Sequence, residues 1–304
     1  MLPEPLYTIK KYPLRSLYVA GLLLLAVGGW IWWSTVSIQP ERVFWDTVEQ
    51  SLSTSAVTIQ AEQSNNGSSL NQTVQYSLGA TNMSHSLTSL RQNGTTVVDE
   101  LVGTPSADYT RYINVQTNQK NKSGKPLNFN GIIGVWAKSD GKSAVPQLFG
   151  QAVLGTGLPI GGVAIPIANL ESVQRAKLIK EIRDDSVYQV KYSTVKKQRI
   201  NGRLQYVYAV DVQPVSYAAL MQRFAQLMGI HALDQLDPAS FKGQEASHLQ
   251  LTIDVRSRHV VSAGVSAVKA AQTYSAYDVP VTITVPTRTI TVQALQQRLT
   301  KMQQ

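Results

Sequence analysis

Cysteine is absent from this chain of 304 residues. That absence excludes disulfide scaffolds, thiol nucleophiles, cysteine-rich zinc sites and lipid attachment through a cysteine. Acidic residues are also scarce, since 19 Asp and Glu stand against 28 Lys and Arg, for a net charge of +9. Only 15% of the residues are charged and 43% are hydrophobic, which excludes a highly charged disordered protein.

The motifs of common catalytic sites are missing as well. The chain contains no G-x-S-x-G, H-E-x-x-H or P-loop pattern, and no G-x-G-x-x-G that follows a strand. His248 and His259 flank a predicted hairpin, but no third metal ligand is close in the sequence. We therefore predict a protein that is not an enzyme, with no catalytic residues, no metal and no cofactor.

One uncharged run lies near the N-terminus, over residues 16–38. At about 1.5 Å per residue it would form a helix of roughly 35 Å, enough to cross a hydrocarbon core of about 30 Å. Basic residues precede the run and acidic residues predominate after it, so the positive-inside rule places residues 1–15 in the cytoplasm and residues 39–304 outside. A cleaved signal peptide, the alternative, has a shorter apolar core and a small-residue cleavage site. We therefore predict a single-pass protein of the cell membrane.

The outer part is predicted to be rich in β-strands, because apolar and polar residues alternate along short segments separated by turn residues. Asn93-Gly94 and Asn201-Gly202 favour two-residue type I′ hairpins, in which both turn residues need a positive φ. Short connections favour antiparallel pairing. The predicted strands are 73–78, 83–91, 95–102, 108–117, 187–200, 203–212, 249–255, 261–267 and 279–285.

Helical spacing of apolar residues predicts helices that begin near Pro40, Asn169, Pro214 and Thr291. Asn169 and Thr291 are suitable N-caps, and Gly229 is a suitable residue to end the third helix. Antiparallel strands combined with a few amphipathic helices define an α+β domain in which helices cover one face of the sheet.

Residues 145–168 form a second apolar segment that carries no charge. Its prolines and glycines argue against a regular helix, and so against a second membrane span. Two interpretations remain open: an irregular loop packed on the core, or a mobile lid that contacts an apolar ligand and therefore avoids charge. The lid candidates are Phe149, Leu154, Leu158 and Ile160.

Basic residues cluster between Lys191 and Arg203 with no acidic residue among them. One interpretation is the solvated face of a hairpin. The other is contact with anionic lipid head groups or acidic wall polymers, because each basic residue near a charged surface contributes about 1 kcal/mol. Nucleic acid is not an expected partner for a domain outside the membrane. The head-group candidates are Lys196, Lys197, Arg199 and Arg203.

The second half of the chain, over roughly 188–286, resembles a known superfamily. Residues 206–229 are a predicted strand that leads into an amphipathic helix, 249–261 are a predicted strand–turn–strand containing Ile-Asp-Val, and 274–286 are a predicted closing strand that ends in proline. This pattern is similar to the bacterial lipoprotein-carrier superfamily, with its LolA-like carriers and LppX- and LprG-like lipid-binding lipoproteins. The resemblance implies a half-open antiparallel β-barrel with helices on its concave face and an apolar cavity between them.

On this resemblance, aromatic and aliphatic residues of the predicted strand and helix would line the cavity. Plain core packing is the alternative for each of them, because core and cavity lining look alike in a sequence. The chain differs from the superfamily in having a predicted span and no cysteine. The apolar cavity candidates are Tyr206, Tyr208, Val210, Leu220, Phe224, Leu227 and Met228.

We therefore expect a membrane-anchored envelope protein whose outer domain binds a lipid or lipidated ligand between sheet and helices. The main alternative is a surface interaction, adhesion or structural module with a filled core, in which exposed loops such as 118–130 would carry the function. A hydrolase of the cell envelope is a third possibility, and it requires a cleft with paired carboxylates that this sequence does not show.

Overall fold

The computed structural model describes residues 22, 25–28, 38–65, 67–79, 81–139, 165–230, 233–234, 236–265 and 270–304. Among these residues, no helix has both the length and the apolar character needed to cross a membrane. Most of the predicted span over 16–38 lies outside the described residues, as do residues 1–15.

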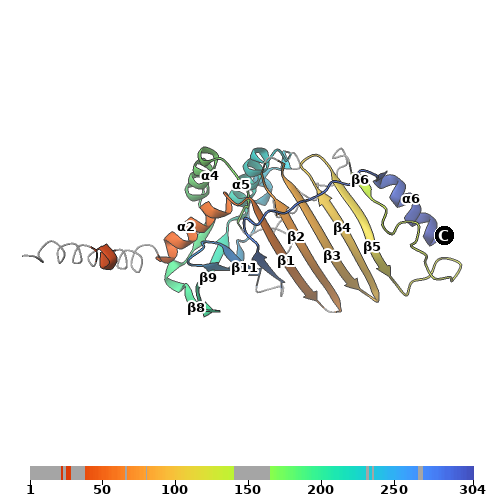
Figure 1. The fold of residues 1–304 in the computed structure, drawn as a ribbon, viewed down its shortest axis with the longest axis horizontal. Helices are drawn as coiled ribbons and strands as arrows, with labels where there is room; N and C mark the ends of the chain where they lie inside the picture. The colour runs from red at the N-terminus through yellow and green to blue at the C-terminus, as the bar shows by residue number, and fades with distance from the viewer. Residues whose placement is uncertain are drawn as a thin grey trace, which may run out of the picture.

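Within the described part of the chain, thirteen strands form one open sheet, and its order places the two halves of the chain side by side (Figure 1). The order is β13-β6-β5-β4-β3-β2-β1-β12-β11-β10-β9-β7, and β8 also pairs with β9. The strands are β1 (Ala56–Asn65), β2 (Ser68–Ser77), β3 (Met83–Gln92), β4 (Thr95–Gly103), β5 (Asp108–Gln116), β6 (Ala137–Ser139), β7 (Tyr188–Val190), β8 (Lys196–Ile200), β9 (Arg203–Val212), β10 (Ser247–Asp254), β11 (Val260–Val265), β12 (Ala270–Ser275) and β13 (Ile290–Thr291).

The sheet consists of two antiparallel meanders. One runs through β1 to β6, the other through β9 to β12, and antiparallel pairing of β1 with β12 joins them. The short β13 is parallel to β6. The predicted α+β class is confirmed in this form, as a mostly antiparallel open sheet with helices.

Both predicted Asn-Gly hairpins are confirmed. Asn93 and Gly94 connect β3 to β4 with φ of 50° and 75°, and Asn201 and Gly202 connect β8 to β9 with φ of 51° and 77°. These are the positive values that a type I′ turn requires, and few other residue pairs adopt them at low cost.

The helices are α2 (Pro40–Ser51), α4 (Ser172–Asp184), α5 (Pro214–Leu227) and α6 (Val292–Gln303). Thr291 caps α6 as predicted, because its Oγ1 accepts a hydrogen bond from the Ala294 amide at 3.1 Å. The predicted N-cap of α4 is wrong. Asn169 bridges to Ser53 instead, and Glu171 caps α4 in a reciprocal capping box with Gln174.

Gly229 ends α5 as predicted, with a φ of 69°. The Gly229 amide donates to the Gln226 carbonyl at 3.1 Å, and the Ile230 amide donates to the Ala225 carbonyl at 2.8 Å. This pair of bonds is a Schellman motif, and it satisfies carbonyls that the end of the helix would leave unpaired.

Two predicted strands differ from the structure. The predicted strand 187–200 is interrupted by a 3₁₀ turn, Tyr192–Thr194, which divides it into β7 and β8. The predicted strand 279–285 is not a strand. It lies extended against the sheet without ladder partners, because its apolar side chains pack onto a sheet face and Pro280 and Pro286 lack an amide proton. Sequence analysis did not predict β1 or β12.

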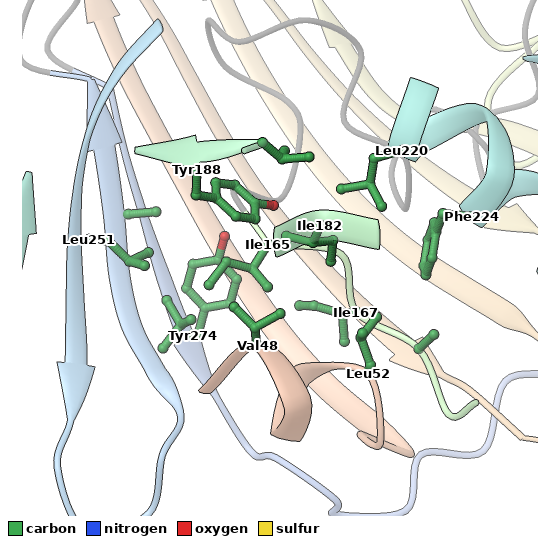
Figure 2. Close-up of a cluster of buried hydrophobic side chains, with 14 of the residues drawn as sticks. Val48, Leu52, Ile165, Ile167, Ile182, Tyr188, Leu220, Phe224, Leu251 and Tyr274 are labelled. Carbon is green, nitrogen blue, oxygen red and sulfur yellow. The ribbon is translucent and has the colours of Figure 1, made fainter. Parts of the chain in front are cut away.

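We name the two faces of the sheet by what covers them. The helix-side face carries alternate residues such as Ile59, Val74, Tyr208 and Leu251, against which α2, α4, α5 and residues 165–170 pack. Figure 2 shows side chains from the helices, the sheet and the 165–170 segment meeting in this core. The opposite face is the tail-side face, named after the extended tail over residues 279–286 that packs on it.

Two smaller clusters lie farther along the sheet. On the tail-side face, Ile283 of the extended tail packs against Val102 and Tyr109. On the helix-side face, Leu295 of α6 packs against Ile132 and Ala137 near the β6 edge. We call the cluster formed with α2, α4 and α5 the three-helix core. The three-helix core and α6 lie at opposite ends of the sheet (Figure 1).

Candidate functional site

The structure brings most of the predicted cavity residues together in one buried core. Tyr206, Tyr208 and Val210 point to the helix-side face from β9, and Leu220, Phe224 and Met228 come from α5 or its end. Leu227 is the exception, because its side chain is 39% exposed.

The chain's own side chains pack closely among these residues. The Phe44 ring of α2 lies 5.7 Å from the Tyr208 ring and 5.9 Å from the Tyr188 ring, in tilted or edge-on contact. Val48 of α2 and Leu52, which follows its last residue, join the same core together with Ile165 and Ile167 (Figure 2). Core packing is therefore the better interpretation for the predicted residues of β9 and α5.

Two of the predicted cavity residues hold the start of α2 on the sheet. The Tyr206 hydroxyl donates to the Ile38 carbonyl at 2.8 Å, and the Tyr208 hydroxyl donates to the Pro40 carbonyl at 2.9 Å. Burial raises the pKa of both phenols, so both remain protonated donors at neutral pH. The predicted span ends at Ile38, so these bonds hold the end of that predicted segment against the sheet.

The head-group candidates lie beside this attachment point. Lys196 and Lys197 of β8 pair with Val207 and Tyr206 of β9, and the Lys197 ammonium lies 5.6 Å from the Tyr206 ring centroid. The four candidates Lys196, Lys197, Arg199 and Arg203 are all exposed.

The lid candidates Phe149, Leu154, Leu158 and Ile160 lie outside the described residues. The described flanks of the segment have definite places. Ser139 ends β6 beside β5, whereas Ile165 is buried in the three-helix core.

A partly exposed apolar row, which sequence analysis missed, crosses the helix-side face of β2 to β5. Strand register places Leu70 beside Leu90, Leu90 beside Val97, and Val97 beside Val115. Leu90 is 39% exposed and the other three are half-buried. With strands about 4.8 Å apart, the row is about 14 Å long. The sequence could have indicated part of this row, because a turn at Asn93-Gly94 fixes the register that places Leu90 beside Val97.

A polar row lies directly beside the apolar row. It consists of Gln72, Thr88, Asp99 and Tyr112, which are register partners across β2 to β5. The Gln72 amide donates to the Ser86 hydroxyl at 3.0 Å. Burial raises the pKa of Asp99 to about 6, and burial together with the charge of Asp99 raises the pKa of Tyr112.

A charged cluster lies on the tail-side face of the same strands. Glu100 accepts from the Arg111 Nε at 2.6 Å and lies 2.8 Å from the His85 Nε2. The Arg111 guanidinium lies 4.7 Å from the Trp136 ring centroid. Burial alone would raise the pKa of Glu100, but the hydrogen bonds from His85 and Arg111 lower it. Each charge in the cluster has a partner, so the cluster is best explained as cross-strand stabilisation.

Among the described residues, no three His, Asp or Glu side chains are grouped so that they could hold a metal ion. His248 pairs with Asp211 at 2.6 Å, whereas His259 stacks on the Tyr277 ring, so these two histidines have separate local partners.

Comparison with known proteins leaves the family open. No model of a protein family matches the chain, and no curated protein sequence matches it. The fold defines its class as an α+β protein with a large, mostly antiparallel open sheet and helices.

Proposed function

We propose that the chain is a single-pass, non-catalytic envelope protein that binds a lipid or lipidated ligand on the helix-side face of its sheet. The observation that carries the proposal is the apolar row Leu70, Leu90, Val97 and Val115, which is half-exposed near the β3–β4 turn and belongs neither to the three-helix core nor to the α6 cluster. This location differs from the part of β9 and α5 on which the sequence-based expectation centred.

The chemistry of the row suits an acyl chain. Aliphatic side chains in line offer about 14 Å of continuous apolar contact, and each CH₂ group removed from water contributes about 0.8 kcal/mol. The neighbouring polar row, with Gln72, Thr88 and Asp99, provides donors and acceptors for an ester or hydroxyl group. Binding of this kind requires no catalytic group.

The location in the membrane follows from the predicted anchor. Residues 1–15 would lie in the cytoplasm, residues 16–38 would cross the bilayer, and residues 39–304 would lie outside. The bonds from Tyr206 and Tyr208 to Ile38 and Pro40 support this proposal, because they hold the domain close to the end of the anchor. A domain held there has access to lipids of its own membrane.

A second candidate function is an interaction or structural module with a filled core. The packing of Phe44, Val48 and Leu52 among the predicted cavity residues favours it. In that case the apolar row would meet a protein partner and not an acyl chain.

The test is photocrosslinking of the full chain in a mild detergent with a phospholipid that carries a diazirine on its acyl chain. After proteolysis, mass spectrometry separates crosslinks to the anchor from crosslinks to β2–β5. We expect crosslinks in β3 and β4 that saturate with lipid concentration. Crosslinks confined to the anchor would contradict lipid binding by the domain and favour the interaction module.

Two leucines of β3 give a matched pair of variants. Leu90 is 39% exposed on the helix-side face, and Leu87 is 44% exposed on the tail-side face. We expect Leu90→Gln to lower crosslinking to β3 and β4 about fivefold, because loss of a leucine contact costs about 1 kcal/mol. Leu87→Gln should leave it unchanged. Equal effects of the two variants would contradict a site on the helix-side face.

A further inference from the structure

The two tyrosine bonds give the β8–β9 hairpin a direction. Tyr208 of β9 bonds to Pro40, and Tyr206, nearer the turn, bonds to Ile38. Moving along β9 toward its turn therefore follows the chain backward from Pro40 to Ile38, the last residue of the predicted span. Arg203 lies three residues beyond Tyr206, about 10 Å farther along β9 at 3.4 Å per residue.

The hairpin end is basic and carries one exposed aliphatic side chain. Arg199, Ile200 and Arg203 surround the Asn201-Gly202 turn, and Ile200 is 47% exposed. A neighbouring turn adds to the charge, because the Val255 amide donates to the Leu204 carbonyl at 3.0 Å and the adjacent Arg256 is exposed.

The nearby acids are partly neutralised. Asp46 of α2 accepts a hydrogen bond from the Arg258 Nε at 3.1 Å, and the Asp254 carboxylate accepts the Arg256 and Ser257 amides. Glu41 is the exposed acid at the start of α2. The end of the domain beside Ile38 is therefore net positive.

We propose that the β8–β9 hairpin is a membrane-contacting element, in which Lys196, Lys197, Arg199 and Arg203 bind anionic phospholipid head groups and Ile200 enters the interface. The head-group layer extends roughly 5–7 Å beyond the hydrocarbon core on each side. Tyr206 bonds to Ile38, the last residue of the predicted span, so the hairpin end lies within about 10 Å of the level at which that layer begins. Charges within a Debye length of about 8 Å from the head groups would be only weakly screened.

The proposal rests on the predicted anchor and is independent of the ligand site on β2–β5. It gives the basic cluster an orienting role, because a second contact with the bilayer restricts the rotation of a domain tethered at one point. The strongest alternative is protection of a sheet edge. Among the described strands β8 pairs with β9, and basic residues on edge strands discourage pairing between molecules.

The test uses the absence of cysteine in the chain, which allows one label per molecule. Ile200→Cys and Gln92→Cys place a fluorophore at equivalent positions, each directly before an Asn-Gly turn, at the membrane-facing hairpin and at the distant β3–β4 hairpin. The full chain is reconstituted in phosphatidylcholine vesicles with or without 30 mol% phosphatidylglycerol. A nitroxide head-group lipid then quenches labels that touch the surface.

We expect the label at residue 200 to be quenched strongly only in the anionic vesicles, and the label at residue 92 in neither. Half-molar salt should reverse the quenching. Combining Lys196→Gln, Arg199→Gln and Arg203→Gln should reduce the quenching of the residue 200 label to that of the residue 92 label. Each lost charge lowers the affinity of the hairpin for the anionic surface about fivefold, so three lost charges lower it roughly a hundredfold. Lys120→Gln, Lys122→Gln and Lys125→Gln, which remove the same charge from an exposed loop, should have no effect.

Several outcomes would overturn the proposal. Equal quenching in both vesicle types, or quenching that persists without the three charges, excludes a head-group contact. Self-association of the charge-depleted variant without any change in quenching assigns the basic residues to edge protection. If the variant fails to fold, the salt dependence of the parent protein decides. Loss of the chain from floated vesicles after alkaline washing would instead show that the anchor fails, whereas the crosslinking of β2–β5 reports separately on ligand binding.

Discussion

The attachment of α2 to the sheet by two tyrosine hydroxyls makes a specific prediction about stability. Tyr206→Phe together with Tyr208→Phe removes both hydroxyls and leaves the rings, which are fully buried. A typical intramolecular hydrogen bond contributes about 1 kcal/mol net, and a carbonyl left unpaired costs about 1–3 kcal/mol. Water reaches the exposed start of α2 in part, so the lower values apply. We expect the double variant to lose about 2 kcal/mol of unfolding free energy.

Equilibrium urea unfolding of the full chain in a mild detergent measures this loss, and hydrogen exchange locates it. Amides of α2 should exchange faster in the double variant, whereas those of β3 and β4 should not. Tyr277→Phe is the matched control, because its hydroxyl also donates to a single carbonyl, that of Val260, at 2.9 Å. It should cost about 1 kcal/mol without faster exchange in α2. The reasoning would be refuted if α2 exchanged at the parental rate in the double variant.

Three further predictions concern single residues. Burial raises the pKa of Asp99 to about 6. Ionising Asp99 in the folded state therefore lowers the free energy of unfolding progressively as the pH rises from about 4 to 6. Asp99→Asn should raise the free energy of unfolding by about 1 kcal/mol at pH 7, after allowance for solvent screening, and leave it unchanged at pH 4, as measured by urea titration at both pH values. Because the pKa of Glu100 is lowered in the folded protein, its contribution to stability is present above pH 4.5 and is lost as the pH falls through the folded pKa. Glu100→Gln should lower the free energy of unfolding by about 2 kcal/mol at pH 7 and by less at pH 3. Gly229→Ala should cost about 1 kcal/mol in thermal unfolding through its positive φ, since no atom crowds the added Cβ, and Gly229→Asn should cost less.

Local chemistry explains the elements that the sequence predicted well. Asn-Gly pairs fixed two hairpins because few other residues adopt two consecutive positive φ values, and Gly229 ended α5 for the same reason. The register of β3 and β4 followed from the first turn. These features depend on a few adjacent residues, so they can be predicted without knowledge of the tertiary structure.

Alternation alone misled where an extended segment lies on a sheet without joining it. Val281 and Ile283 face the sheet while Thr282 and Thr284 face solvent, which is the pattern of a half-buried strand. Conversely, β12 reads Ala-Ala-Gln-Thr-Tyr-Ser and carries little apolar signal, although it joins the two meanders through β1. Its place depends on partners far away in the sequence.

The candidate site shows the same limit more sharply. The resemblance to the lipoprotein-carrier superfamily implied that Tyr206 and Tyr208 line a cavity wall, and their burial agrees with either a cavity or a core. What decides between the two is the segment that packs against them, and that segment, from Ile38 through α2, lies 168 residues earlier in the chain. A buried tyrosine needs a partner for its hydroxyl, and a backbone carbonyl at the end of a predicted membrane span provides one. The bonds that hold α2 against Tyr206 and Tyr208 therefore favour core packing at the predicted cavity, and they support the proposal that the basic hairpin beside Ile38 contacts the bilayer.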